Sequence, residues 1–303
     1  MKIVGPFAEL FDTITEDDKR EAARVKPISM LSAETLAAIR NVAMRTSGPV
    51  IEIGTYIGGT SILLARAISD RGNGRLICVE AGGEHLLHPQ MPSRDILADW
   101  RANLFAAHLR EIPTMIEGFA YLPSVIEKIK ASIYPEKAGM IVIDADGFPG
   151  ITLADLDGVL SSECIVIIDD YVSSSEQKEL IKRQVDRLKQ ENSLEEMGVL
   201  PFGTWFGNMR RRVESFTLGL IFASSYGKGY CERIPIRACN EKWELFEDDR
   251  EVSMRLALPD EVLTSGDGCY CLVGDDGGGF VCFAPYGNPP DLTGRQFELR
   301  RPR

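Results

Sequence analysis

The sequence predicts a doubly wound α/β domain with a mostly parallel sheet and helices on both of its faces. From residue 49 onward, short apolar segments alternate with helix-length amphipathic segments, which is typical of parallel strands joined by helices. Runs such as Ile165-Val166-Ile167-Ile168 are apolar on both sides, so both faces of the sheet are expected to be covered. Right-handed crossovers between such strands give a Rossmann-like arrangement.

The elements are expected in the following order. Residues 1–48 form a helical N-terminal cap, in which Thr15 begins a charged helix and Ser32 caps a second, amphipathic one. Residues 49–225 form the α/β domain, and residues 226–303 form a small β-rich appendage with a hairpin turn at 275–279. Strands are expected at 50–54, 75–80, 114–118, 139–144, 164–169 and 216–223, and helices at 60–69, 96–109, 120–129, 151–160 and 174–192.

Composition excludes several partners. The 303 residues hold 34 Lys and Arg against 45 Asp and Glu, and a net charge of -11 argues against nucleic acid as a partner. No apolar run approaches the ~20 residues of a membrane helix, and the first residues lack a secretory pattern. The 7 cysteines include no C-x-x-C pair, so reduced thiols in the cytoplasm are expected. A homo-oligomer is left open.

The residues that end the strands carry the predicted chemistry, because ligands of doubly wound sheets bind at the carboxyl ends of the strands. Gly54 allows a sharp turn after the first strand, and Gly58 lets a ligand approach the next helix. Glu80 ends the second strand, where a carboxylate suits a ribose diol. Gly118-Phe119 after the third strand suits an adenine ring. The glycines alone fit a plain tight turn; together with Glu80 they favour a nucleotide-like ligand.

The loop from Glu52 to Gly58, with Glu80, resembles the cofactor motifs of the class I S-adenosylmethionine-dependent methyltransferases. The resemblance covers roughly residues 49–225. It implies S-adenosylmethionine as the cofactor, with the glycine loop beside its methionine part and the acid on its ribose. The cofactor-binding residues that it implies are Glu52, Gly54, Tyr56, Gly58, Thr60, Glu80, Gly118, Phe119 and Asp144.

Carboxylates also follow the fourth and fifth strands, at Asp144 and at Asp169-Asp170. Three like charges at one sheet edge are costly without a cation, and oxygen ligands suit Mg²⁺. The pattern is similar to the metal-dependent O-methyltransferases of catechols and of macrolide or other antibiotic sugars. That resemblance implies Mg²⁺ bound by Asp144, Asp169 and Asp170, holding two neighbouring acceptor hydroxyls. Helix capping by these acids is the alternative.

One position departs from these enzymes. They usually carry a His or Lys general base three residues after the fourth-strand Asp, where this chain has Gly147. The catalytic residues are therefore predicted to be Asp144 and Asp146, with His85, His88 and His108 as other sources of a base. Activation by metal alone, a relocated base and altered chemistry all stay open.

The predicted function is an O-methyltransferase, Mg²⁺-assisted, that acts on a small hydroxylated metabolite or sugar, with residues 202–208 lining the acceptor site. One alternative is an S-adenosylmethionine-binding protein with non-methylating chemistry or a binding role, since Gly147 replaces the usual base. A nicotinamide-dependent oxidoreductase is disfavoured, because no Tyr is followed by Lys at the Tyr-x-x-x-Lys spacing. An interaction module that uses the β-rich appendage is the last alternative.

Overall fold

The computed structural model describes residues 12–86, 90–120, 123–145, 149–172 and 176–213, together with short strands of the C-terminal part. The chain divides into two compact units, residues 1–213 and residues 214–303. The first unit contains the α/β sheet with its helices and the N-terminal helices that precede the sheet in the sequence. None of the described helices has both the length and the apolar character that crossing a membrane requires.

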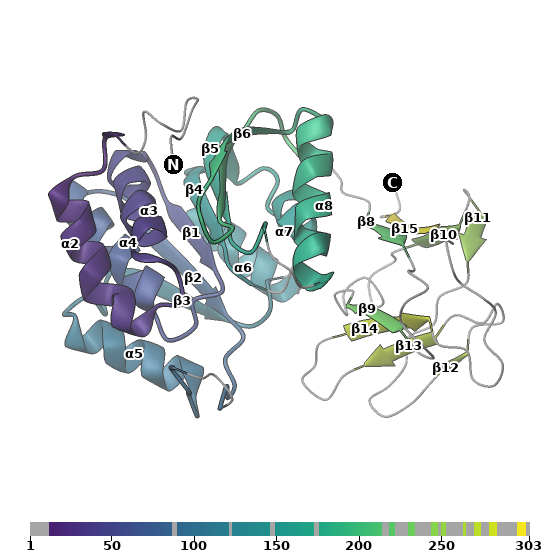
Figure 1. Ribbon diagram of the computed structural model, residues 1–303, viewed down its shortest axis with the longest axis horizontal. Coiled ribbons are helices and arrows are strands. Elements are labelled where there is room, and N and C mark those ends of the chain that lie inside the picture. Colours follow the sequence, from purple (N-terminus) through teal and green to yellow (C-terminus); the bar gives the residue numbers. More distant parts are fainter. Residues whose placement is uncertain are drawn as a thin grey trace. The chain divides into compact units, whose positions relative to one another are not determined.

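The first unit is built on a seven-stranded sheet in the order β3-β2-β1-β4-β5-β7-β6 (Figure 1). β1 pairs in parallel with β2 and β4, and β7 runs antiparallel to both β5 and β6. The predicted doubly wound, mostly parallel sheet is thus confirmed. The chain winds outward from β1 in one direction and then from β4 in the other, so the order of strands reverses between β1 and β4. The strands are β1 (Val50–Ile53), β2 (Leu76–Glu80), β3 (Pro113–Glu117), β4 (Ala138–Ile143), β5 (Leu160–Ile168), β6 (Leu194–Val199) and β7 (Trp205–Met209).

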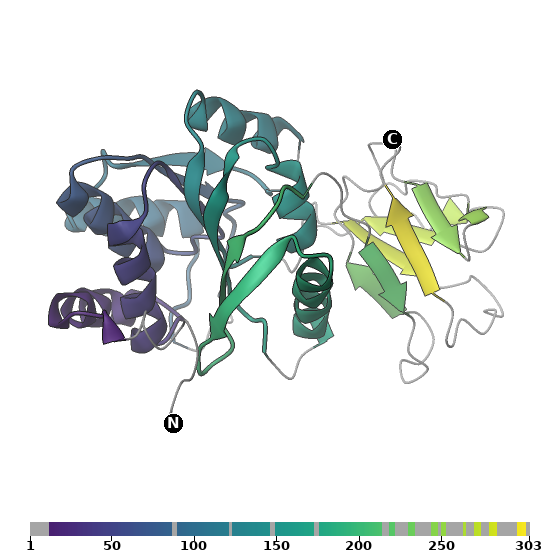
Figure 2. The same cartoon turned by 90° about the horizontal axis from the view of Figure 1, so that it is seen from above.

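Helices lie on both sides of this sheet, as the view from above shows (Figure 2). Amphipathic segments that connect parallel strands fold as helices because each strand end must return across the sheet to start the next strand. Two of the expected boundaries shift by several residues: the helix expected at 120–129 is found at 123–133, and the one at 151–160 ends at Asp155. The helices are α4 (Gly59–Arg71), α5 (Ile96–Ala106), α6 (Pro123–Ile133), α7 (Pro149–Asp155) and α8 (Glu176–Gln190).

The N-terminal segment folds as α2 (Glu16–Val25), the short helix η1 (Lys26–Ile28) and α3 (Ala33–Arg45). Thr15 caps α2 in a capping box with Asp18, and Ser32 caps α3, as predicted. Apolar residues of the cap belong to the same buried cluster as apolar residues of the sheet and of α4. The cap therefore shares its hydrophobic core with the α/β domain.

Strands β6 and β7 were not predicted. Residues 202–208 were expected to line an acceptor site, but Trp205 and Phe206 are fully buried in the core. β6 is an edge strand, and its outer residues Glu195 and Glu196 are exposed, so it lacks the apolar run of a central strand. Phe202, in the turn before β7, is 79% exposed.

The second unit contains two four-stranded antiparallel sheets within its described strands, in the orders β11-β10-β15-β8 and β12-β13-β14-β9. β13 and β14 pair as the expected hairpin, and its turn lies outside the described residues. β8, the strand expected at 216–223, pairs with β15, so the division falls at 213/214 rather than at 225/226. The strands are β8 (Leu218–Ile221), β9 (Tyr230–Arg233), β10 (Glu244–Glu247), β11 (Arg250–Val252), β12 (Leu263–Thr264), β13 (Tyr270–Val273), β14 (Gly279–Phe283) and β15 (Gln296–Arg300).

Candidate cofactor pocket

A cavity of about 300 Å³ lies at the carboxyl ends of β1, β2, β3 and β4. This is the place where the order of strands reverses, and therefore where a doubly wound sheet leaves room for a ligand. Six of the predicted residues line it, namely Gly54, Tyr56, Glu80, Gly118, Phe119 and Asp144. The other lining residues are Met30, Ile53, Val79, Ala81, His85, Ile96, Ala120 and Ala145. The mixture of apolar walls with a few carboxylates is typical of a small-molecule site.

The loop after β1 takes a backbone course that few residues tolerate. Gly54 has φ +82°, and a Cβ atom placed there would overlap the backbone carbonyl oxygen of Asp144. Glycine is therefore required where the ends of β1 and β4 approach each other. Tyr56, two residues on, also has a positive φ of 47°, which is unusual for a bulky residue and common at functional sites.

Glu80 holds this loop in place. Its Oε2 accepts hydrogen bonds from the backbone N–H groups of Thr55 at 3.0 Å and of Tyr56 at 2.8 Å. Its Oε1 accepts the backbone N–H of Gly82 at 3.0 Å. Hydrogen bonds to a carboxylate are stronger than those between neutral groups, so this one side chain fixes the loop after β1 and the start of the loop after β2. Glu80 also lines the cavity.

The segment after β2 forms another wall of the cavity. His85 pairs with Ser93 through a β-bridge, with N···O distances of 2.8 and 3.2 Å. The Tyr56 hydroxyl donates to the backbone carbonyl of Met91, and the rings of Tyr56 and His85 meet edge to face at 5.9 Å. His85 is thus held beside the cavity, as a relocated base would need to be. His88 lies outside the described residues.

Three predicted cofactor residues do not line the cavity. Gly58 caps α4 with φ +95°, where a Cβ would come within 2.9 Å of Trp100 Cδ1. Thr60 is buried in the first turn of α4. Glu52 is fully buried behind the loop, where it accepts hydrogen bonds from Ser61 and Cys78. Burial raises the pKa of Glu52 to about 7, against the opposing effect of those two hydrogen bonds. Alternation along β1 turns Glu52 away from the face of Ile53.

The predicted metal ligands are not gathered into a site. Asp144 lines the cavity, whereas Asp169 accepts a hydrogen bond from Thr204 Oγ1 at 2.5 Å, a contact made from the start of β7. Asp170 follows with φ +59°. Within the described part of the chain, no three His, Cys, Asp or Glu side chains come together in a way that would hold a metal ion. Mg²⁺ binding by Asp144, Asp169 and Asp170 stays a prediction. Asp146 and Gly147 lie outside the described residues.

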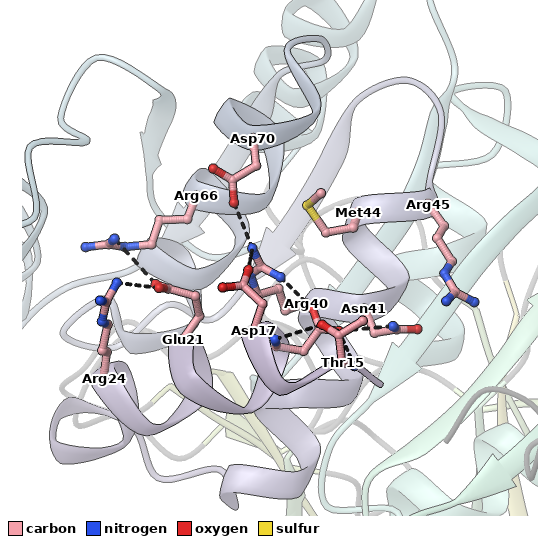
Figure 3. Close-up of a pocket in the computed structure, with 11 residues that line it drawn as sticks. Thr15, Asp17, Glu21, Arg24, Arg40, Asn41, Met44, Arg45, Arg66 and Asp70 are labelled. Carbon is pink, nitrogen blue, oxygen red and sulfur yellow. Dashed lines mark hydrogen bonds and ion pairs between the residues drawn. The ribbon is translucent and has the colours of Figure 1, made fainter. Parts of the chain in front are cut away.

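A second cavity, of about 640 Å³, lies among α2, α3 and α4 and shares no lining residue with the first (Figure 3). Arg40, only 4% exposed, forms ion pairs there with Asp17 at 2.8 Å, Asp18 at 2.6 Å and Asp70 at 2.7 Å. Burial opposes charging of Asp18, but hydrogen bonds from Thr15, Arg40 and Asn41 lower its pKa overall. The ion pairs of Arg40 with Asp70 and of Arg66 with Glu21 join the N-terminal helices to α4.

The comparisons with known proteins agree with this geometry. Residues 51–171 match the family model described as a methyltransferase domain. The sequence-based resemblance to class I S-adenosylmethionine-dependent methyltransferases is thereby confirmed for this region. No curated protein matches the chain.

Among solved structures, cofactor-bound Rv0187 from MTB is 15% identical and covers 70% of this chain and 100% of its own, with a TM-score of 0.48. The O-methyltransferase of Bacillus cereus in complex with SAH is 18% identical and covers 64% and 91%, with a TM-score of 0.46. The O-methyltransferase TomG of Streptomyces achromogenes, in complex with SAM, is 16% identical and covers 64% and 90%, with a TM-score of 0.47.

Proposed function

We propose that this chain binds S-adenosylmethionine in the cavity at the carboxyl ends of β1 to β4 and transfers its methyl group to an oxygen of a small hydroxylated metabolite or sugar. The observation that carries the proposal is the meeting of Gly54, Glu80 and Asp144 around one cavity, within the region that matches a methyltransferase domain. Oxygen as the acceptor atom rests on the sequence resemblance to O-methyltransferases.

The cavity residues suit the parts of this cofactor. Glu80 Oε2 accepts the two amides of the loop, whereas Oε1 accepts the Gly82 amide and can take a further hydrogen bond, so a ribose hydroxyl can donate to Oε1 while the amides remain bound. Gly118-Phe119 offers a glycine and an aromatic ring to the adenine. Gly54 lets the loop pass close to the end of β4, and the Asp144 carboxylate can accept from the amino group of the methionine part.

The reaction needs alignment more than activation. An acceptor oxygen attacks the methyl carbon as the carbon–sulfur bond breaks, which gives the methyl ether, S-adenosylhomocysteine and a proton. Holding oxygen, carbon and sulfur in line supplies much of the rate enhancement. Asp144 and His85 both line the cavity and can accept the proton, and Asp146 stays a prediction. The described residues form no metal site, so no step is assigned to Mg²⁺.

Two measurements test the proposal. Isothermal titration calorimetry should detect binding of S-adenosylmethionine and S-adenosylhomocysteine, and mass spectrometry across a panel of hydroxylated acceptors should detect a methyl ether. If neither cofactor form binds, the proposal is wrong. If both bind and no acceptor is methylated, the alternative of a cofactor-binding protein with other chemistry gains support from Gly147.

Metal dependence is tested separately. If Mg²⁺ assists the reaction as the sequence resemblance implies, EDTA abolishes methyl transfer and added Mg²⁺ restores it, and Asp169→Ala is inactive. Unchanged activity in both experiments removes the metal from the proposed function.

Cys78 and Cys164 are both buried and free, which supports the proposal of a reducing, cytoplasmic location.

A further inference from the structure

The carboxyl group of Glu52, in β1, is fully buried next to the loop that follows this strand and lines the cofactor pocket. Ser61 Oγ donates to Glu52 Oε2 at 2.6 Å, and Cys78 Sγ donates to the same oxygen at 3.2 Å. Glu52 Oε1 receives no hydrogen bond from any described residue, and no cationic side chain forms an ion pair with Glu52 in that part of the chain. When ionised, this carboxylate is therefore a buried charge with too little compensation.

Contacts from α4 and α5 connect this carboxyl to the pocket loop. Ser61 Oγ, which donates to Glu52, accepts a hydrogen bond from Trp100 Nε1 at 2.9 Å. The Trp100 ring packs against Gly58, and Asn103 Nδ2 donates to the backbone carbonyl of Ile57 at 2.8 Å. Glu52 is also only one residue from Ile53, which lines the pocket. These contacts connect the carboxyl group to the loop after β1, of which Gly54 and Tyr56 line the cavity.

Few charged groups act on Glu52. Cys78 of β2 is its titratable neighbour, and the negative charge of Glu80 adds to the effect of burial in raising its pKa. α4 and α5 contribute the neutral Ser61 and Trp100, and Val142 of β4 is the register partner of Glu52. A positive charge that enters the pocket would therefore stabilise the ionised form.

S-adenosylmethionine brings such a charge, because its sulfur is a sulfonium, whereas the sulfur of S-adenosylhomocysteine is a neutral thioether. We propose that Glu52 is a specificity-determining residue whose buried carboxylate makes the pocket bind the sulfonium cofactor more tightly than the demethylated product. Glu52 acts through its charge and does not touch the cofactor. This inference rests on the proposed function and assigns to the same pocket a preference between the two cofactor forms.

The test is the ratio of the two affinities, measured by calorimetry at pH 6 and pH 8. The sulfonium lowers the pKa of Glu52 from about 7, so S-adenosylmethionine binding releases a proton and strengthens as pH rises. The ratio is expected to increase roughly fivefold between pH 6 and pH 8 if the sulfonium lowers the pKa of Glu52 by about one unit. The sulfonium also affects the ionisation of the ligand's own amino group, and Glu52→Gln measures that contribution to the ratio. In Glu52→Gln the ratio is lower at pH 8 and lacks the part of the pH dependence that comes from Glu52. Glu163→Gln, which removes an exposed charge on β5, keeps the wild-type behaviour.

The outcomes separate the two proposals. If neither ligand binds, the proposed function fails. If both bind but the wild-type ratio is independent of pH, or if Glu52→Gln retains the wild-type dependence, the role of Glu52 is overturned and the proposed function stands. Should Glu52→Gln not fold, the wild type decides: titrations in two buffers of different ionisation enthalpy must show more protons released by S-adenosylmethionine than by S-adenosylhomocysteine.

Discussion

The Glu80 carboxylate accepts the backbone N–H of Tyr56 at 2.8 Å, so the acid that ends β2 holds the loop that follows β1. The same oxygen accepts the N–H of Thr55. A residue expected to contact the cofactor is therefore also the anchor of the glycine loop. Binding and loop shape depend on one side chain.

Replacing Glu80 with Gln should weaken S-adenosylmethionine binding by roughly 10- to 100-fold, because hydrogen bonds to a charged acceptor contribute about 1.5–3 kcal/mol. Calorimetry measures the change. Glu117→Gln is the matched control, since Glu117 ends β3 in direct register with Glu80 but is exposed and paired with Arg101. Equal losses in the two variants would refute the specific role of Glu80.

Gly54→Ala should abolish cofactor binding and destabilise the fold, because the added Cβ overlaps the Asp144 carbonyl oxygen at a positive φ. Gly72→Ala is the control: Gly72 also has a positive φ, +73°, but a Cβ there meets nothing within 4 Å. Gly72→Ala should cost only about 1 kcal/mol of unfolding free energy. Urea denaturation and calorimetry check both variants, and normal cofactor binding by Gly54→Ala would contradict the prediction.

Arg40→Met should lower the free energy of unfolding by about 3–5 kcal/mol, because it leaves the buried Asp18 carboxylate without its cation. Arg20→Met removes an exposed partner of Asp17 and should cost less than about 1 kcal/mol. The pKa of Asp18 is lowered in the fold, so the wild-type advantage is present above its ordinary value of 3.8 and is lost as pH falls below it. Urea melts at pH 7 and pH 3 measure this loss.

Glu52→Gln should gain stability relative to the wild type as pH rises. The folded protein keeps the Glu52 proton up to pH about 7, whereas the unfolded chain loses it near 4.5, so the wild type is destabilised between these values. The relative gain should reach about 3 kcal/mol above pH 7. Urea melts of both proteins at pH 4.5 and pH 8 test it, and parallel pH profiles would show that Glu52 does not titrate in this range.

The central strands were predictable because strands buried on both faces must be continuous apolar runs, as at Ile165–Ile168. β6 was not, because an edge strand needs few apolar residues and is defined by pairing with β7. The apolar runs also predicted where each central strand ends, and the residues at those ends include the pocket residues Gly54, Glu80 and Asp144.

The remaining site residues depend on contacts that local sequence does not encode. Thr204 belongs to none of the strand-end motifs, yet its hydroxyl donates a hydrogen bond to Asp169, which lies 35 residues earlier in the sequence. Glu52 belongs to the same short motif as Gly54, but its side chain is buried on the other face of β1 and does not line the pocket. Period-two alternation along β1 was the available signal, because it places Glu52 opposite to Ile53.

The ion pairs of Arg40 have a consequence for how the chain can be divided. They join Asp17 and Asp18 of α2 to Asp70 at the end of α4, across more than fifty residues of sequence. Apolar side chains of the cap, such as Ala22 and Leu36, are buried with Leu63 of α4. A shortened protein that begins at β1 would expose this shared core and remove the Arg40 partner of Asp70, so the smallest stable fragment that keeps the α/β sheet must retain both N-terminal helices.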